Sequence, residues 1–161
     1  KAINEKGYDV KLNLIGANVG VASANLQQAI KTEDAKNYVR TTKFMNVNEI
    51  VDELKKADIG LFASSCENMP NTLVEMMGSG IPIACSNRGP MLEVLGTNNF
   101  TFNPFKIDEI VNVLTDMINN YENAIKHGQI CLETSKKFSW LKCSQDTFKN
   151  ISDFKFDNDL D

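Results

Sequence analysis

The sequence predicts an α/β fold built on a doubly wound, mainly parallel sheet of about five or six strands, with helices on both faces. First, short apolar runs alternate with longer amphipathic segments, which is the pattern of repeated βα units. Second, the compact apolar run Ile59–Ala63 is typical of a strand buried in a parallel sheet. At 161 residues, the chain is long enough for one domain with its own core.

Each predicted strand is a short apolar or β-branched run bounded by turn residues. The run Val10–Ile15 alternates and stops at Gly16, and Tyr38–Phe44 is rich in residues that favour strands. Pro82 stands at the beginning of its run, where a strand tolerates a residue without an N–H group. The predicted strands are residues 10–15, 38–44, 59–63, 81–85 and 100–102.

The predicted helices are the longer segments between and after the strands, and several of them carry apolar residues at steps of three and four. The clearest stripe runs from Ile107 to Tyr121, and Asp108 and Glu109 stand near its start, where the helix dipole favours acids. We interpret Trp140 as part of a C-terminal helix that packs on the core, although its ring could instead stack on a base. The predicted helices are residues 22–35, 50–57, 72–79, 91–95, 107–121, 125–138 and 140–151. Residues 1–152 therefore form one domain, and residues 153–161 an acidic tail.

Composition excludes several classes of function. The formal net charge of −4 and the scattered basic residues argue against a nucleic-acid surface, which needs clustered Lys and Arg. No apolar run approaches the roughly 20 residues of a membrane span. The four cysteines and the lone His127 form no metal-ligand pattern, so we expect no metal site and free thiols in a reducing cytoplasm.

The segment Ser64–Glu75 carries the best candidate site. It follows the predicted central strand and leads into a helix, and ligands of doubly wound sheets bind beyond the carboxyl ends of the strands. A helix start offers unpaired N–H groups and positive potential, which suit a phosphate. Pro70 fixes the backbone near the first turn, and Asn71 and Thr72 add short polar side chains that can cap the helix or contact an anion.

Two carboxylates, Glu67 and Glu75, bracket this predicted phosphate site at a spacing of eight. Carboxylates repel phosphate, so their expected partners are hydroxyl groups on either side of it. A nucleoside diphosphate sugar has that arrangement, with sugar hydroxyls, a diphosphate and ribose hydroxyls in order. The alternative is structural, because two glutamates around a capped helix start also occur on ordinary surface helices.

From Ser64 onward, the chain resembles the C-terminal domain of the retaining glycosyltransferases called glycosyl transferases group 1, which share the GT-B architecture. Their signature is a strand and a loop ending in Ser, then Glu-Gly-Phe-Pro, small or apolar residues and a second Glu, before a helix and a strand. Here it corresponds to residues 64–86. A Gly-containing loop before Pro-Glu resembles residues 87–96, and the stretches at 102–104 and 138–140 also match. Asn68 and Met69 depart from the usual Gly and aromatic residue, which implies a donor pocket of different shape.

The resemblance implies that Glu67 contacts the donor sugar and that Glu75 binds the ribose hydroxyls. It further implies that backbone amides hold the distal phosphate and that the turns at two earlier strand ends face the base and the cleft. The implied site residues are Glu67 as the catalytic residue and Gly16, Asn46, Val47, Asn71, Thr72, Leu73 and Glu75 as donor-binding residues.

By the same resemblance, the function is transfer of a hexose-type sugar, with retention of configuration, to a polysaccharide or glycolipid acceptor. The donor is a nucleoside diphosphate sugar such as a UDP-sugar, with no metal and no further cofactor. We expect a cytoplasmic protein, with the complete enzyme at the inner face of the membrane. The resemblance also implies that the chain is a fragment that lacks its first strand and an N-terminal acceptor domain, and that it binds donor weakly and transfers nothing alone.

Several alternatives stay open from the sequence. A nucleotide-sugar epimerase can share the same two-domain architecture, and a degenerate domain kept for assembly would not be catalytic at all. The run Gly16–Gly20 is not GxGxxG, which favours a tight turn over a dinucleotide-binding loop. Arg88 precedes a glycine in a predicted loop, so it is either an exposed charge or a contact for an anionic ligand.

Overall fold

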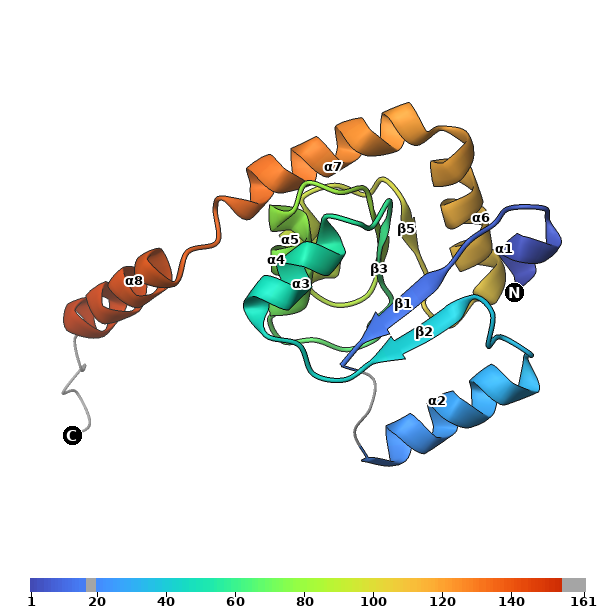
Figure 1. The fold of residues 1–161 in the computed structure, drawn as a ribbon. Helices are drawn as coiled ribbons and strands as arrows, with labels where there is room; N and C mark the ends of the chain where they lie inside the picture. The colour runs from blue at the N-terminus through green and yellow to red at the C-terminus, as the bar shows by residue number, and fades with distance from the viewer. Residues whose placement is uncertain (17–19, 155–161) are drawn as a thin grey trace, which may run out of the picture.

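The computed structural model of the chain describes residues 1–16 and 20–154 and has an α/β fold (Figure 1). Each run predicted as a strand overlaps one observed strand, and the observed strands are shorter than the predicted runs. The strands are β1 (Leu12–Ile15), β2 (Val39–Thr42), β3 (Gly60–Phe62), β4 (Ile83–Ser86) and β5 (Thr101–Phe102). The predicted fold class, parallel strands flanked by helices, is therefore confirmed.

The described strands are all parallel but form two sheets, β1–β2 and β3–β4–β5, whereas the sequence predicted one. The register pairs Leu12 with Val39 in the first sheet, and Gly60 with Ile83 and Cys85 with Thr101 in the second. No ladder of hydrogen bonds joins β1 to β3 among the described strands. Apolar runs identify strands but not the edges that pair, since pairing depends on contacts far apart in the sequence.

All seven predicted helices are present, and a short first helix was not predicted. The helices are α1 (Ala2–Glu5), α2 (Gly20–Thr32), α3 (Val47–Leu54), α4 (Asn71–Gly78), α5 (Met91–Leu95), α6 (Ile107–Asn119), α7 (Tyr121–Ser135) and α8 (Trp140–Asp153). The start of α3 shows most clearly how local hydrogen bonds fix where a helix begins. The Asn46 side chain accepts a hydrogen bond from the Glu49 N–H at 3.1 Å, and the Glu49 carboxylate accepts one from the Asn46 N–H at 2.7 Å. This capping box satisfies two backbone donors at the helix start.

Two apolar clusters around the β3–β4–β5 sheet form the core. The first joins β3 and β4 to α4, α5 and α7, with Leu73, Met77 and Ile83 fully buried. The second joins β4 and β5 to α6 and α7, around the fully buried Phe102 and Met117. Since neighbouring parallel strands and the helices between them bury a continuous surface, this sheet is held rigidly.

Helix α7 runs across α4 and α5 (Figure 1). A Cβ added at Gly128 would lie 2.6 Å from the Gly80 carbonyl oxygen, so only glycine permits this close approach. One residue earlier, His127 is 2% exposed and its ring meets Phe100 edge to face, with centroids 5.2 Å apart. The polar residues next to His127 in the sequence did not suggest a buried histidine, but Ala124, Gly128 and Cys131 of α7 are buried with it.

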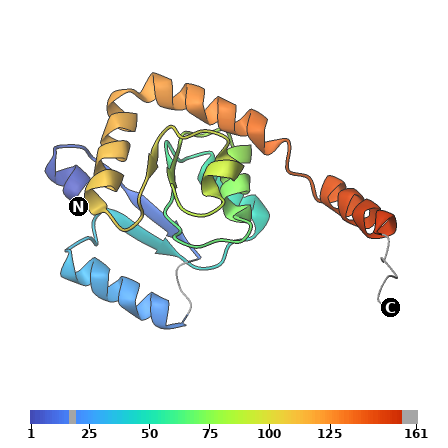
Figure 2. The ribbon, with the colours of Figure 1, turned by 180° about the vertical axis from the view of Figure 1, so that it is seen from behind.

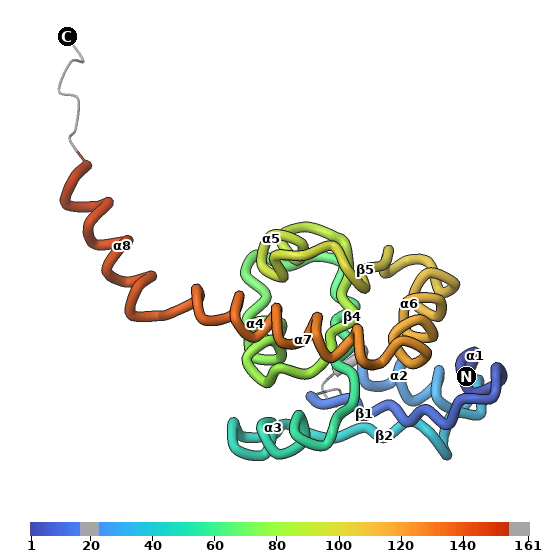
Figure 3. The backbone as a smooth tube through the Cα atoms, turned by 90° about the horizontal axis from the view of Figure 1, so that it is seen from above, coloured from blue at the N-terminus to red at the C-terminus, as the bar shows by residue number. Residues whose placement is uncertain are grey.

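Helix α8 leaves the body of the domain and projects outward, as Figures 2 and 3 show from two further directions. It has no buried residue, and Trp140 is 79% exposed. The prediction that the C-terminal helix packs on the core was therefore wrong for Trp140, although Phe138 does pack against the first cluster. The chain turns away between α7 and α8, and α8 restarts with the Ser139 hydroxyl accepting a hydrogen bond from the Lys142 N–H. The predicted acidic tail lies outside the described residues beyond residue 154.

No helix in the described part of the chain combines the length and the apolar character that crossing a membrane requires.

Candidate functional site

Three loops meet at the carboxyl edge of the β3–β4–β5 sheet. They are residues 63–70 after β3, residues 87–90 after β4 and residues 103–106 after β5. The strands are parallel, so their carboxyl ends lie at one edge, where ligands of α/β sheets bind. The Asn87 N–H donates to the Phe102 carbonyl at 2.8 Å, which holds the second loop beside the third. A Cβ added at Gly89 would lie 4.0 Å from the Glu67 carbonyl oxygen, which places the second loop against the first.

The two predicted carboxylates flank the start of α4. Glu67 is half-buried in the loop after β3, and Glu75 is exposed in the second turn of α4. Neither side chain makes a hydrogen bond or ion pair with another residue in 1–16 or 20–154, whereas seven ion pairs form elsewhere in these ranges. Both carboxylates are therefore available to a ligand that approaches this helix.

Some backbone N–H groups at the start of α4 already donate hydrogen bonds within the chain. The Asn71 N–H donates to the Met69 carbonyl at 2.9 Å, and the Leu73 N–H donates to the Pro70 carbonyl at 3.0 Å. Of the three amides predicted to hold a phosphate, only that of Thr72 has no acceptor among the described residues. The Leu73 side chain is fully buried, so any ligand contact of this residue is through its backbone. The described turn thus presents one open amide to an anion.

The other predicted donor-binding residues belong to the first sheet. Gly16 ends β1 at φ +79°, and its N–H donates to the Thr42 carbonyl at 3.1 Å. Asn46 and Val47 follow β2 at the start of α3, where Val47 is 75% exposed and the Asn46 N–H is taken by Glu49. The structure therefore brings Glu67, the α4 start and Gly89 together, and it leaves Gly16, Asn46 and Val47 at the end of a separate sheet. Residues 17–19 of the predicted turn lie outside the described residues.

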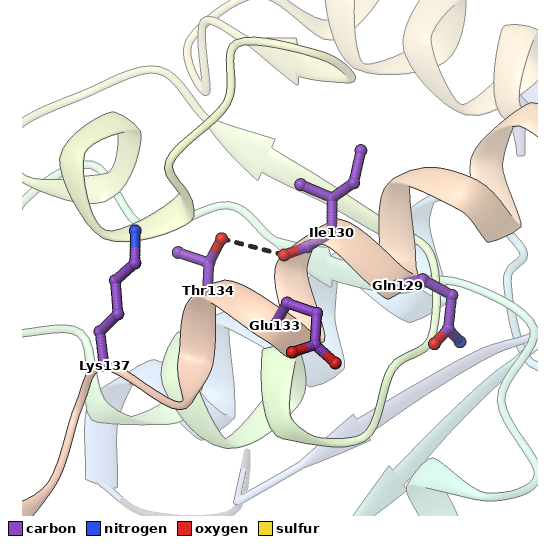
Figure 4. A pocket seen from close by; sticks show the side chains of 5 residues that line it. All are labelled: Gln129, Ile130, Glu133, Thr134 and Lys137. Carbon is purple, nitrogen blue, oxygen red and sulfur yellow. Dashed lines mark hydrogen bonds between the residues drawn. The ribbon is translucent and has the colours of Figure 1, made fainter.

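A shallow hollow lies along α7 rather than at the loop edge (Figure 4). It is lined by Gln129, Ile130, Glu133, Thr134 and Lys137, and the Thr134 hydroxyl donates to the Ile130 carbonyl at 2.9 Å. Each of these residues comes from one helix or the residues just after it. None is a residue that the sequence predicted for ligand binding, and all lie on one short stretch of chain, so we assign the hollow no role.

The thiols and potential metal ligands are scattered. All four cysteines are described and free; Cys85 and Cys131 are buried, and Cys66 and Cys143 are exposed. Burial raises the pKa of Cys85 to about 12 and that of Cys131 to about 11, so both stay protonated at neutral pH. Within residues 1–16 and 20–154, no three His, Cys, Asp or Glu side chains gather as a metal site would need.

Two curated relatives are glycosyltransferases. A sulfoquinovosyl transferase of Arabidopsis thaliana is 26% identical over 98 residues, which cover 55% of this chain and 19% of that protein. An uncharacterised glycosyltransferase of Haemophilus influenzae is 27% identical over 126 residues, which cover 76% of this chain and 34% of that protein. The chain therefore spans between a fifth and about a third of the curated relatives that it matches.

Solved glycosyltransferase structures share the fold. A glycosyltransferase of Rickettsia africae matches 96% of this chain and 43% of its own, with a TM-score of 0.82 at 16% identity. The Anabaena protein HepE, solved in complex with UDP-glucose, matches 90% of this chain and 41% of its own, with a TM-score of 0.79 at 22% identity. At these identities the likeness establishes the fold alone, a Rossmann-like domain that these longer chains contain.

A profile of the family described as glycosyl transferases group 1 matches residues 1–131, which is most of the chain and includes all five strands and the Glu67–Glu75 segment. The chain belongs to the glycosyl transferases group 1 family.

Proposed function

We propose that the chain is the donor-binding domain of a retaining glycosyltransferase. Its donor is a nucleoside diphosphate sugar, and the transferred sugar goes to a polysaccharide or a glycolipid. The observation that carries this proposal is a pair of carboxylates, Glu67 and Glu75, on either side of the α4 start at the carboxyl edge of a parallel sheet. Neither has a hydrogen-bond or ion-pair partner in the described part of the chain. Family membership and the UDP-glucose named in the structure of HepE support a nucleotide-sugar donor.

In this proposal each part of the donor meets a different group. Glu67 accepts hydrogen bonds from sugar hydroxyls, and Glu75 accepts them from the ribose hydroxyls. The distal phosphate lies at the α4 start, where the open Thr72 amide donates to it first. The N–H groups of Asn71 and Leu73 donate to the phosphate only when their hydrogen bonds to the Met69 and Pro70 carbonyls break. Negative charge that develops on the leaving diphosphate is then stabilised by the positive end of α4.

We assign the contacts with the nucleotide base to loops at the carboxyl end of the β1–β2 sheet. The Asn46–Val47 turn after β2 is the proposed base-binding group, and Gly16, at the end of β1, is proposed to face the same donor. Glu49 takes the Asn46 N–H, and the Ile50 N–H donates to the Asn46 carbonyl at 3.0 Å. The Val47 N–H, which has no acceptor among the described residues, is therefore the backbone group left for a base. This assignment requires the carboxyl ends of the two sheets to face one ligand.

An acceptor-binding domain, in our proposal, belongs to a longer protein. The solved relatives are more than twice as long as the part that matches this chain, which supports that view. The apolar face of α8 supports it as well, because Trp140, Leu141, Phe148 and Ile151 are each at least 65% exposed and need a partner surface. The 161 residues alone then bind donor weakly and transfer no sugar.

The proposal includes no metal and no further cofactor, so addition of Mg²⁺ or of a chelator should leave donor binding unchanged. It places the protein in the cytoplasm, where four free thiols are stable, and the longer enzyme at the inner face of the membrane when the acceptor is a lipid.

The nucleotide assignment is tested by Glu75→Ala. Hydrogen bonds to a charged group contribute roughly 1.5–3 kcal/mol, so this variant should bind nucleoside diphosphates about ten- to a hundred-fold more weakly. Amide chemical shifts during titration with UDP and GDP would measure both affinities. Glu122→Ala, which removes an exposed carboxylate from α7, is the matched control. Equal affinities for wild type and Glu75→Ala would remove Glu75 from the donor site.

The sugar assignment is tested by Glu67→Ala with the same ligands. We expect a large loss of affinity for a nucleotide sugar and little change for the bare nucleotide, because Glu67 contacts only the sugar. An equal loss for both ligands would contradict this role. Conversion of the bound sugar into its epimer would favour the epimerase, and no binding of any nucleotide would favour a non-catalytic domain.

A further inference from the structure

The two arginines of the chain are held in opposite ways. Arg40 forms an ion pair with Glu53 at 2.6 Å and a hydrogen bond with Asn13 at 3.2 Å. Arg88 has no carboxylate partner among residues 1–16 and 20–154, and its guanidinium lies 5.5 Å from the centre of the Phe105 ring. A cation at this distance from a ring is attracted to its face, so Arg88 is oriented while its charge stays uncompensated.

The backbone fixes the loop that carries Arg88. Its N–H donates to the hydroxyl of the fully buried Ser86 at 3.2 Å, and its carbonyl accepts from the Met91 N–H at 3.3 Å. Gly89 follows with φ +51°, a conformation that favours glycine and turns the loop toward the Glu67 carbonyl. Arg88 therefore stands on a short, braced turn beside the loop of the proposed sugar contact.

Phe105 is held as firmly as Arg88. The Phe105 N–H donates to the Asn103 side chain at 3.1 Å, and the Asn103 N–H donates to the Glu109 carboxylate at 2.8 Å. Glu109 is also paired with Lys106 at 2.9 Å, so the lysine of this loop is engaged while Arg88 is not. Phe105 is 70% exposed, so its ring lies at the surface together with the Arg88 guanidinium.

We propose that Arg88, supported by Phe105, binds an oxyanion at the sugar end of the donor. The oxyanion is either the distal phosphate or an acidic group carried by the sugar itself. This inference rests on the proposed function for the identity of the ligand, but its geometry is independent of Glu75. A planar guanidinium suits either group, because it can donate two parallel hydrogen bonds to a phosphate, carboxylate or sulfonate.

The charge around the site supports this placement. Glu67 and Glu75 are both anionic and lie on either side of the proposed phosphate, which they repel. The α4 start offers one open amide and a partial positive charge. Arg88, on the loop beside Glu67, would add a full positive charge near the sugar end of the donor.

The test compares Arg88→Gln with wild type for four ligands: UMP, UDP, UDP-glucose and UDP-glucuronate, with the guanosine series in parallel. Loss of a charge-assisted pair should weaken binding about ten-fold or more. Weakening of UDP and of both sugar nucleotides, but not of UMP, would assign Arg88 to the distal phosphate. Weakening of UDP-glucuronate alone would assign it to an acidic group on the sugar. Unchanged binding of all four, or an equal loss that includes UMP, would overturn the proposal.

Three further variants separate binding from structure. Lys126→Gln removes one exposed charge from α7 and should change none of the affinities. Arg88→Lys keeps the charge but loses the planar donor pair, so it should restore binding only in part. Phe105→Leu keeps apolar bulk without a π face and should weaken the same ligands as Arg88→Gln, though by less.

Failure of the proposed function is distinguishable from failure of this inference. If wild type binds no nucleotide, the proposed donor role fails, and inorganic pyrophosphate then tests the oxyanion site directly. Pyrophosphate should shift the amide resonances of Gly89 and Phe105 in wild type and not in Arg88→Gln. Equal pyrophosphate-induced shifts in wild type and Arg88→Gln would contradict the proposal, whatever the result of the nucleotide titrations.

Discussion

Residues 1–58 and residues 59–138 share a βα organisation but differ in how much they bury. Among the described side chains of the first region, only Ala35 is buried. The second region contains both core clusters and thirteen fully or nearly fully buried apolar residues. Helix α3 of the first region buries no residue, whereas α4, of the same length, buries Leu73 and Met77.

The difference in burial between the two regions indicates which of them contributes most to stability and which proposed contacts lie on the less stable region. Parallel sheets are normally covered on both faces, and the β1–β2 sheet is not. Regions with few buried apolar contacts open locally more easily than the core. The proposed sugar and phosphate contacts therefore stand on the rigid region, while Gly16 and the Asn46–Val47 turn stand on the looser one. Ordering of the looser region is an expected cost of donor binding.

The largest expected effect separates the two regions by mutation. Phe102→Ala empties a fully buried position in the second cluster and should lower the free energy of unfolding by about 3–5 kcal/mol. Leu14→Ala removes a half-buried side chain from β1 and should cost only about 1 kcal/mol. Urea denaturation of both variants measures the two values. Similar losses would show that the first region is as well packed as the second.

An effect of intermediate size is expected in the dependence of the free energy of unfolding on pH. Burial lowers the pKa of His127 in the folded state, so below its unfolded value of about 6.5 the unfolded chain binds more protons than the folded one. Stability should be complete above this pH and decrease as the pH falls, by at most about 1.4 kcal/mol for each pH unit. Denaturation of wild type and His127→Asn between pH 5 and 7 measures this slope. A slope that persists unchanged in the variant would assign it to other groups.

The smallest effect is expected on α8. Phe148 is 72% exposed on a helix that buries nothing, so Phe148→Ser should change the free energy of unfolding by less than about 0.5 kcal/mol. The same denaturation curves measure it. A loss comparable to that of Phe102→Ala would mean that α8 packs against the domain in solution.

The sequence predicted the elements well because their signals are local. Short apolar or β-branched runs identified the five strands of the described residues, and longer, mostly amphipathic segments identified seven helices. The segment of the candidate site could also be predicted from the sequence, because its strand, loop and helix follow one another from Ile59 to Glu75. Phe105 was missed as a partner of Arg88, and the only signal was an aromatic residue in a loop after a strand.

The pairing of Arg88 with Phe105 depends on the β4–β5 ladder, which joins Cys85 to Thr101 and Ser86 to Phe102, each pair sixteen positions apart. The burial of His127 similarly depends on α7 crossing to meet Phe100. Neither follows from local periodicity, because each requires two segments to meet across the sheet. The same reason explains why one sheet was predicted where the described strands form two.

By itself, the sequence determined the α/β class, the order of the elements and the position of Glu67 and Glu75 around a helix start, since these follow from the spacing of neighbouring residues. Only the tertiary structure decided which loops meet at the carboxyl edge, that Arg88 is oriented by Phe105, and that α8 stands away from the core. Those features depend on the packing of distant segments, where small differences in buried area select one arrangement among several that the same local pattern permits.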